Sequence, residues 1–254
     1  MKNKLFKALA IFIWILIWQV VGIFIDNEIF LATPLTVLLK IIDLSQNWDF
    51  WTSILFSFSR IVSGFLIGSA AGIIIAGMSY RYGIIKTFIW PLISVIKSAP
   101  VVSFIILFLI LMSSRNLSIL ISFLMVLPIV YTNVLKGFEN TDKKMLEMAR
   151  LFRVKSIKKI KYIYLPSVYP FFYSACQVSL GLCWKSGITA ELVGTPSGSI
   201  GEKLYQAKLY LDTGELFAWT LIIILISIVF EKFFLAILKI AMKKFREVGY
   251  EYSN

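Results

Sequence analysis

The sequence contains no histidine, only two cysteines and few charged residues. Asp, Glu, Lys and Arg together make up 16% of the 254 residues, whereas hydrophobic residues make up 59%. Without histidine the chain lacks the commonest general base and the commonest neutral metal ligand, which disfavours an enzyme or a metal centre. Cys176 and Cys183 lie in one apolar segment. A helix would separate them by about 10 Å along its axis, so we expect buried packing thiols and no disulfide.

A phosphate-binding loop is also missing, because no segment matches Gly, four residues, Gly-Lys-Ser/Thr. This chain is therefore not expected to hydrolyse ATP itself, and it is expected to hold no cofactor or metal ion. The net charge of +12 would suggest nucleic acid for a soluble protein. Basic and aromatic residues do not interleave on a polar face, however, so we expect no nucleic-acid partner.

The apolar residues come in long runs, and the mean hydropathy is +0.83. One soluble core could not bury that much apolar surface, so these apolar runs must lie in a lipid bilayer. An outer-membrane barrel would instead show short alternating segments. We predict an all-α integral membrane protein, a single transmembrane domain over 1–254, with apolar runs near the roughly 20 residues that a spanning helix needs, at about 6–25, 52–78, 101–112, 117–135, 168–192 and 216–238.

Two segments between the spans and one glycine pattern within a span are also informative. Residues 84–97 are expected to form an interfacial helix leading into the third span, and residues 140–166 a long charged loop. In the second span Gly64, Gly68 and Gly72 recur every four residues. This spacing is typical of close-packed membrane helices, although glycine is also simply common in such helices.

Six spans place both termini on one side of the membrane, and the basic residues select that side. Only Lys40, Arg115, Lys203 and Lys208 fall on the opposite side. The prediction is therefore a multi-pass protein of a cell membrane with cytoplasmic N- and C-termini. The residues on the cytoplasmic side in this topology are Lys2, Lys4, Lys7, Arg81, Lys86, Lys136, Lys143, Lys144, Arg150, Arg153, Lys155, Lys158, Lys159, Lys161, Lys239, Lys243, Lys244 and Arg246.

The charged loop contains an amphipathic pattern. Met145, Met148, Ala149 and Phe152 recur at helical spacing, after a possible cap among residues 140–142. Such a stripe outside the membrane needs a partner groove or a lipid surface. Methionine and phenylalanine suit a groove, and the alternative is a basic helix lying on anionic headgroups.

The loop resembles a motif of permease subunits of bacterial ATP-binding-cassette importers. That motif reads Glu-Ala-Ala, three residues, Gly, nine residues, Ile, one residue, Leu-Pro. Met148 and Arg153 depart from it, and an arginine resists the left-handed backbone that glycine allows. The positions that agree are Glu147, Ala149, Ile163, Leu165 and Pro166.

The resemblance covers most of the chain and points to the nitrate, sulfonate and taurine branch of these permeases. It implies the type I importer fold, with a loop helix that docks on the ATPase through Met145, Glu147, Met148, Ala149, Phe152, Arg153, Leu165 and Pro166. It also implies three partners: ABC ATPase subunits, an extracytoplasmic substrate-binding protein and a second permease copy, expected to be identical. Permeases for thiamine precursors or other ring compounds look similar, so the substrate stays open.

The fifth span carries one polar face. Ser174, Gln177, Gly181 and Lys185 fall within about 80° on a helical wheel, with the two cysteines opposite. Such a stripe either lines a water-filled path or bonds to a neighbouring helix, and the lysine favours the path. Glu191 lies about 80° from the centre of the stripe and is included in the predicted path.

Two other function classes compete with an importer subunit. A membrane enzyme acting on lipid would show clustered acids or histidines near one interface, and the sequence shows none. A channel or secondary transporter working alone would have no need of the loop helix, and inverted repeats are not evident. We therefore expect a non-catalytic subunit that depends on its partners for energy.

Overall fold

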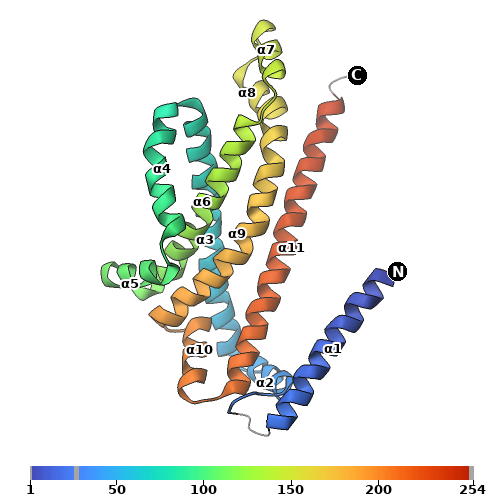
Figure 1. Ribbon diagram of the computed structural model, residues 1–254, viewed down its shortest axis with the longest axis vertical. Helices are drawn as coiled ribbons and strands as arrows, with labels where there is room; N and C mark the ends of the chain where they lie inside the picture. Colours follow the sequence, from blue (N-terminus) through green and yellow to red (C-terminus); the bar gives the residue numbers. More distant parts are fainter. Residues whose placement is uncertain (1, 26–28, 252–254) are drawn as a thin grey trace.

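The computed structural model describes residues 2–25 and 29–251, although not the side chains of 2–5, 7, 8 and 244–251. The described residues form helices and no strand. Figure 1 shows them as a long bundle. In chain order the elements are α1 (Lys2–Ile25), α2 (Pro34–Ser45), α3 (Trp48–Arg81), α4 (Gly83–Ser98), α5 (Val101–Leu111), η1 (Ser114–Asn116), α6 (Leu117–Glu139), α7 (Lys143–Leu151), α8 (Ser156–Lys159), η2 (Ile160–Tyr164), α9 (Leu165–Gly194), α10 (Ile200–Leu209) and α11 (Thr213–Glu251).

The centre of the bundle is the packing of α6 between α3 and α9. Gly64, Gly68 and Gly72 all face α6. A Cβ added at Gly64 would lie 2.4 Å from the carbonyl oxygen of Ile119, so α6 can approach only a residue without a side chain. The prediction that these glycines mark a helix contact is therefore confirmed. In a bilayer, helices are held together by close packing of this kind, since lipid provides no hydrophobic driving force between them.

The region between α3 and α6 differs from the sequence prediction. Residues 84–97 were expected at the interface, yet α4 runs along the bundle beside α3 and α6 (Figure 1). α5, expected to be the span, turns away from α4 by 105°. Its 11 residues reach only about 16 Å, roughly half the hydrocarbon thickness. By length and composition the pair is one broken span or a re-entrant segment, and the assignment of 84–97 as a lead-in and 101–112 as a span stays a prediction.

Three described helices, α3, η1 with α6, and α11, are long and apolar enough to cross a membrane, and the bent α4–α5 pair raises the number to four. The predicted count of six therefore stays a prediction. The first predicted span is helical, with an apolar stretch at Leu9–Ile25. The fifth predicted span coincides with α9, whose 30 residues include Lys185 and Glu191.

Two further helices, α2 and α10, lie between the predicted spans. α2 begins at a capped Thr33-Pro34 pair, in which the Thr33 hydroxyl accepts from the Thr36 N–H. α10 begins at Ser199, whose hydroxyl accepts from the Glu202 N–H at 3.0 Å. Both starts carry capping signals that a reading of hydropathy alone misses.

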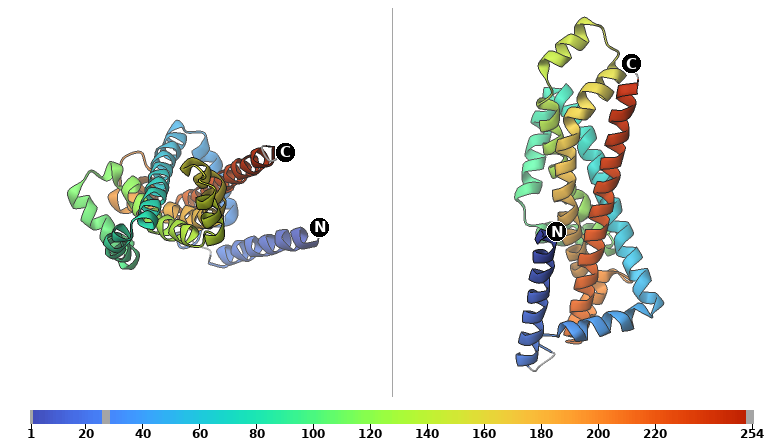
Figure 2. Two further views of the ribbon diagram at one scale, coloured as in Figure 1. Left: turned by 90° about the horizontal axis from the view of Figure 1, so that it is seen from above. Right: turned by 90° about the vertical axis from the view of Figure 1, so that its right-hand side faces the viewer.

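The bundle has two distinct ends. One end carries α7 and α8 and the last turns of α11, and we call it the α7 end (Figure 1). The other carries α2 and α10, and we call it the α10 end. Figure 2 shows α1 leaning away from the other helices, anchored near the α10 end by a bond from Trp18 Nε1 to the carbonyl oxygen of Ala32. The side chains of Lys2, Lys4, Lys7, Lys244 and Arg246, used in the orientation prediction, lie outside the described part of the chain.

Candidate functional site

At the α7 end, the helix α7 displays an uncovered apolar surface. Asp142 caps it by accepting from the Lys144 N–H at 2.8 Å. Met145 and Met148 are each 49% exposed and Phe152 is 76% exposed. Ala149 is buried against the chain's own loop, so the predicted stripe divides into a packed residue and three exposed ones. Glu147 is exposed on the flank of this surface.

Arg153 adopts the left-handed backbone expected of glycine, with a φ of 48°. Its N–H donates to the Arg150 carbonyl, and the Val154 N–H donates to the Ala149 carbonyl at 2.9 Å. These two bonds are the pattern that ends a helix with a C′ residue in the left-handed region. The helix-ending turn is therefore present although the Arg153 side chain disfavours its left-handed backbone.

Leu165 and Pro166 lie where α9 begins, half-buried, and not on α7. The five residues before them, η2, form a π-helical turn in which the Leu165 N–H donates to the Ile160 carbonyl. A proline has no N–H and its ring crowds the preceding turn, which the wider π turn accommodates. Helix therefore continues without a break from Ser156 to Gly194.

The polar stripe of α9 is uncovered along most of its length. Ser174, Gln177 and Lys185 are exposed, and a Cβ at Gly181 would meet no atom within 4 Å. Cys176 and Cys183 are fully buried on the opposite face. The structure thus brings these four stripe residues onto one open face, as the helical wheel indicates.

Glu191 is separate from that face. It is fully buried, and its Oε2 accepts a hydrogen bond from Ser57 Oγ at 2.5 Å. Ser57 Oγ accepts in turn from the Ile200 N–H at 2.9 Å, so one hydroxyl joins α3, α9 and the first turn of α10. Gly201 permits this contact, since a Cβ there would lie 2.3 Å from the Cβ of Glu191. The inclusion of Glu191 in an open path is not supported by this position.

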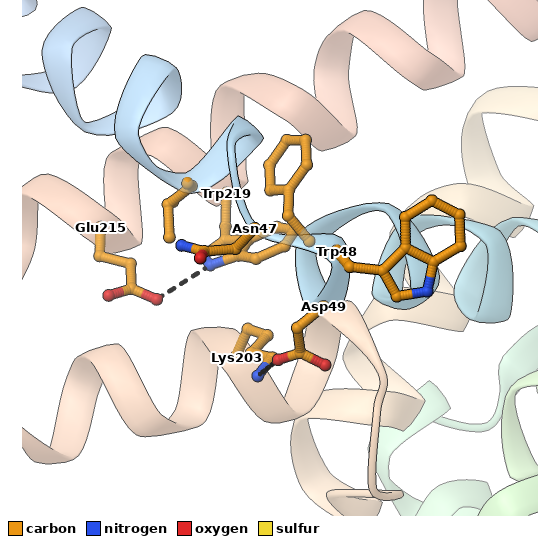
Figure 3. Close-up of a pocket in the computed structure, with 8 residues that line it drawn as sticks. Asn47, Trp48, Asp49, Lys203, Glu215 and Trp219 are labelled. Atoms are coloured by element: carbon orange, nitrogen blue, oxygen red, sulfur yellow. Dashed lines mark hydrogen bonds and ion pairs between the residues drawn. The ribbon is translucent and has the colours of Figure 1, made fainter.

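A polar pocket of about 260 Å³ lies at the α10 end (Figure 3). Lys203 on α10 forms an ion pair there with Asp49 at the start of α3. On the opposite wall Trp219 Nε1 donates to Glu215 Oε1 at 3.2 Å. Sequence reasoning missed this pocket, because its walls come from α2, α3, α10 and α11.

Close to this pocket, α2 is tied to the turn before α11. Lys40 Nζ donates to Asp212 Oδ2 at 2.8 Å, and Glu215 lies 3.9 Å from the same ammonium. The hydrogen bond to Asp212 outweighs burial and raises the pKa of Lys40. Burial opposes ionisation of Asp212, but the bonds from Lys40 and from the Glu215 N–H prevail and lower its pKa.

Comparison with known proteins places these features in a family. The family model described as "Binding-protein-dependent transport system inner membrane component" matches residues 68–247, which include α7 and α9. A Bacillus subtilis protein named as an aliphatic sulfonates transport permease, SsuC, is 29% identical over 87% of this chain and 79% of its own length. The taurine transport system permease protein TauC of Escherichia coli is 22% identical over 88% of this chain and 82% of its own.

Two further comparisons agree. The nitrate import permease protein NrtB of Synechococcus elongatus is 23% identical over 61% of this chain and 55% of its own length. A crystal structure of an amino acid ABC transporter with histidines aligns with a TM-score of 0.60 at 16% identity, covering 81% of this chain and 97% of that one. This structural likeness carries the fold alone.

Proposed function

Since the chain belongs to the family of binding-protein-dependent transport system inner membrane components, we propose that it forms the translocation path of an ATP-driven importer for a small sulfonate, taurine, nitrate or a similar solute. The observation that carries the proposal is a family match that includes α7 with its exposed Met145, Met148 and Phe152. The named relatives, permeases for aliphatic sulfonates, taurine and nitrate, support the substrate class.

In this proposal α7 is the contact with the ATPase. Its exposed surface is apolar and flexible in shape, as suits a helix entering a groove on a partner. The closed turn at Arg153 fixes how α7 joins the following residues, so that force on the helix reaches α9 through α8 and η2. The ATPase supplies ATP and Mg²⁺ chemistry, and this chain supplies none.

The orientation follows from the same assignment. With α7 in the cytoplasm, the α7 end also carries Arg81, Lys86, Lys136 and the lysines of the loop, whereas the α10 end carries Lys40, Lys203 and Lys208. This asymmetry is the one expected of cytoplasmic loops. The α10 end then faces the extracytoplasmic binding protein, and both termini are cytoplasmic.

The path is proposed along the polar face of α9. Ser174, Gln177, Gly181 and Lys185 are left uncovered by this chain. A second, identical permease copy covering that face would enclose a polar channel at the interface between the two chains. A lysine in such a channel attracts an anionic or zwitterionic group, because the Coulomb energy grows as the effective dielectric constant falls from about 80 towards 20.

The experiment reconstitutes the permease with its ATPase and binding protein and measures ATP-dependent uptake of labelled taurine, an alkanesulfonate and nitrate. Phe152→Asp should abolish copurification of the ATPase or its coupled hydrolysis while leaving the permease inserted. Ile84→Asp, an equally exposed apolar site at the same end but outside the loop, is the matched control and should retain coupling.

Two results would count against these proposals. If Phe152→Asp couples normally, α7 lies on lipid and not in a groove. If the intact complex hydrolyses ATP but takes up none of the three solutes, the substrate class is wrong while the importer assignment stands.

A further inference from the structure

A second polar groove lies between α4 and α6, in the half of the bundle nearer the α7 end. It encloses about 220 Å³, and its walls include Trp90, Ile93 and Leu135. Three ammonium groups line it, those of Lys86, Lys97 and Lys136, but only one carboxylate, that of Glu139. The groove therefore carries a formal excess of two positive charges.

The one carboxylate is already paired. Glu139 Oε1 binds Lys86 Nζ at 2.6 Å, at the end of the groove nearest α7. Among the described side chains, neither Lys97 nor Lys136 belongs to an ion pair. Lys97 and Lys136 line the same groove, so their two positive charges share a site in which the one carboxylate is already paired with Lys86.

Protein groups satisfy these ammonium groups poorly. Lys97 Nζ lies 3.5 Å from Thr132 Oγ1, at the long limit of a hydrogen bond. The Thr132 hydroxyl already donates to the Pro128 carbonyl at 2.7 Å, and the Ser94 hydroxyl donates to the Trp90 carbonyl at 2.9 Å. The hydroxyls of the groove are thus committed, and the free donors are ammonium protons.

We propose that the α4–α6 groove binds an oxyanion, such as a sulfonate or phosphate group, between Lys97 and Lys136. An ammonium is a compact point charge with no fixed fork geometry, so two of them select negative charge more than a particular shape. A sulfonate and a phosphate meet that requirement equally. The oxyanion comes either from a soluble substrate on its way to the cytoplasm, a source that rests on the proposed function, or from the headgroup of an anionic lipid.

The test measures protection of individual lysines from an amine-acylating reagent, mapped by mass spectrometry on the complete transporter in nanodiscs. One arm adds ethanesulfonate to phosphatidylcholine nanodiscs, with sodium chloride at equal ionic strength as reference. The other arm replaces part of the phosphatidylcholine by phosphatidylglycerol. The bound anion should slow acylation of Lys97 and Lys136 about threefold at a concentration about twice its dissociation constant. The rate at Lys232, an exposed lysine of α11, should not change.

Variants and a second readout separate specific binding from general screening. Lys136→Gln should abolish the protection of Lys97, and the matched Lys232→Gln should leave it intact. The anion should also raise the melting temperature of the wild-type complex and of Lys232→Gln, but not that of Lys136→Gln. This readout applies even where Lys97 reacts too slowly to follow.

The outcomes decide the proposal and its source. Protection by ethanesulfonate identifies a soluble oxyanion, and protection by phosphatidylglycerol alone identifies a lipid headgroup. Equal protection by sodium chloride, equal protection of all lysines, or no protection and no thermal shift in either arm would overturn the site. None of these readouts requires uptake, so a wrong substrate class and an absent anion site give different results.

Discussion

Ser57 on α3 and Glu191 on α9, which are 134 residues apart in the sequence, share a fully buried hydrogen bond of 2.5 Å. Ser57 also accepts from the first N–H of α10. The second oxygen of Glu191 has no partner among the described residues. One hydroxyl and one carboxyl group thus join α3, α9 and the start of α10 inside the bundle, beside the ion pair of Lys203 with Asp49.

Ser57→Ala removes the donor to Glu191 and the acceptor of the Ile200 N–H together. Leaving both partners buried and unsatisfied should lower the free energy of unfolding of the complex by about 1–3 kcal/mol. The measurement is thermal unfolding of the purified transporter. Ser59→Ala is the matched control, because Ser59 is exposed and bonds only to the Phe56 carbonyl of its own helix. Equal stability of the two variants would show that the buried bond contributes nothing.

Arg153→Gly should stabilise the turn that ends α7. Glycine adopts a φ of 48° without the cost of about 1 kcal/mol that an L side chain meets there. Exchange of the Val154 amide hydrogen, which is bonded to the Ala149 carbonyl, should slow about fivefold. Arg150→Gly, inside the helix, should have the opposite effect. Faster exchange in Arg153→Gly would mean that the arginine side chain itself holds the turn.

Lys185→Met keeps the length and apolar packing of the side chain but removes its charge. If the exposed face of α9 lines the path, uptake of a sulfonate should fall while the amount of assembled complex is unchanged. Lys185→Arg should retain part of the uptake. Normal uptake by the methionine variant would place the path on another face, and loss of assembly would indicate that the lysine pairs within the dimer.

Asp212→Asn should weaken the tie between α2 and the turn before α11. Because the pKa of Asp212 is lowered in the folded protein, the ion pair stabilises the fold above the usual aspartate pKa of about 3.9 and is lost as the pH falls through the lowered value. The pKa of Lys40 is raised, so at the alkaline end the pair persists up to that raised value.

At neutral pH the loss should be about 0.5 kcal/mol, because both side chains are about one third exposed. The difference in melting temperature between wild type and Asp212→Asn should vanish once the pH falls below the pKa of Asp212. Asp43→Asn, an exposed acid on α2, should show a smaller difference. A difference for Asp212→Asn that persists in acid would contradict the ion-pair explanation.

Features that depend on local periodicity could be predicted from the sequence. The glycines of α3, the polar stripe of α9 and its buried cysteines all follow from residue spacing on a helix. The bend between α4 and α5 was not predicted, because Lys86, Pro91 and Lys97 give α4 the pattern of an interfacial helix, whereas α5 is apolar throughout. Hydropathy alone does not reveal that the α5 helix has only 11 residues or that it turns away from α4 by 105°.

Features that depend on distant partners could not be predicted. Lys185 and Glu191 look similar as ionisable residues of one span, yet one is exposed and the other is bonded to Ser57. Helical spacing fixes the direction of a side chain but not the helix it meets. The groove between α4 and α6 likewise needs the packing of two helices, although the unpaired lysines were visible in the sequence.

The unbroken helix from Ser156 to Gly194 has a mechanical consequence. Its 39 residues extend about 58 Å along their path, with one end beside α7 and the other at the Glu191 attachment of α10. α6 packs along the α9 part of this helix, from Gly137 against Val168 to Leu117 against Gly194, so the two helices are expected to move together and a displacement beside α7 is expected to reach the attachment of α10. In the proposed importer, closure of the ATPase on α7 would therefore be transmitted to the α10 end through this one helix and not through the connecting loops.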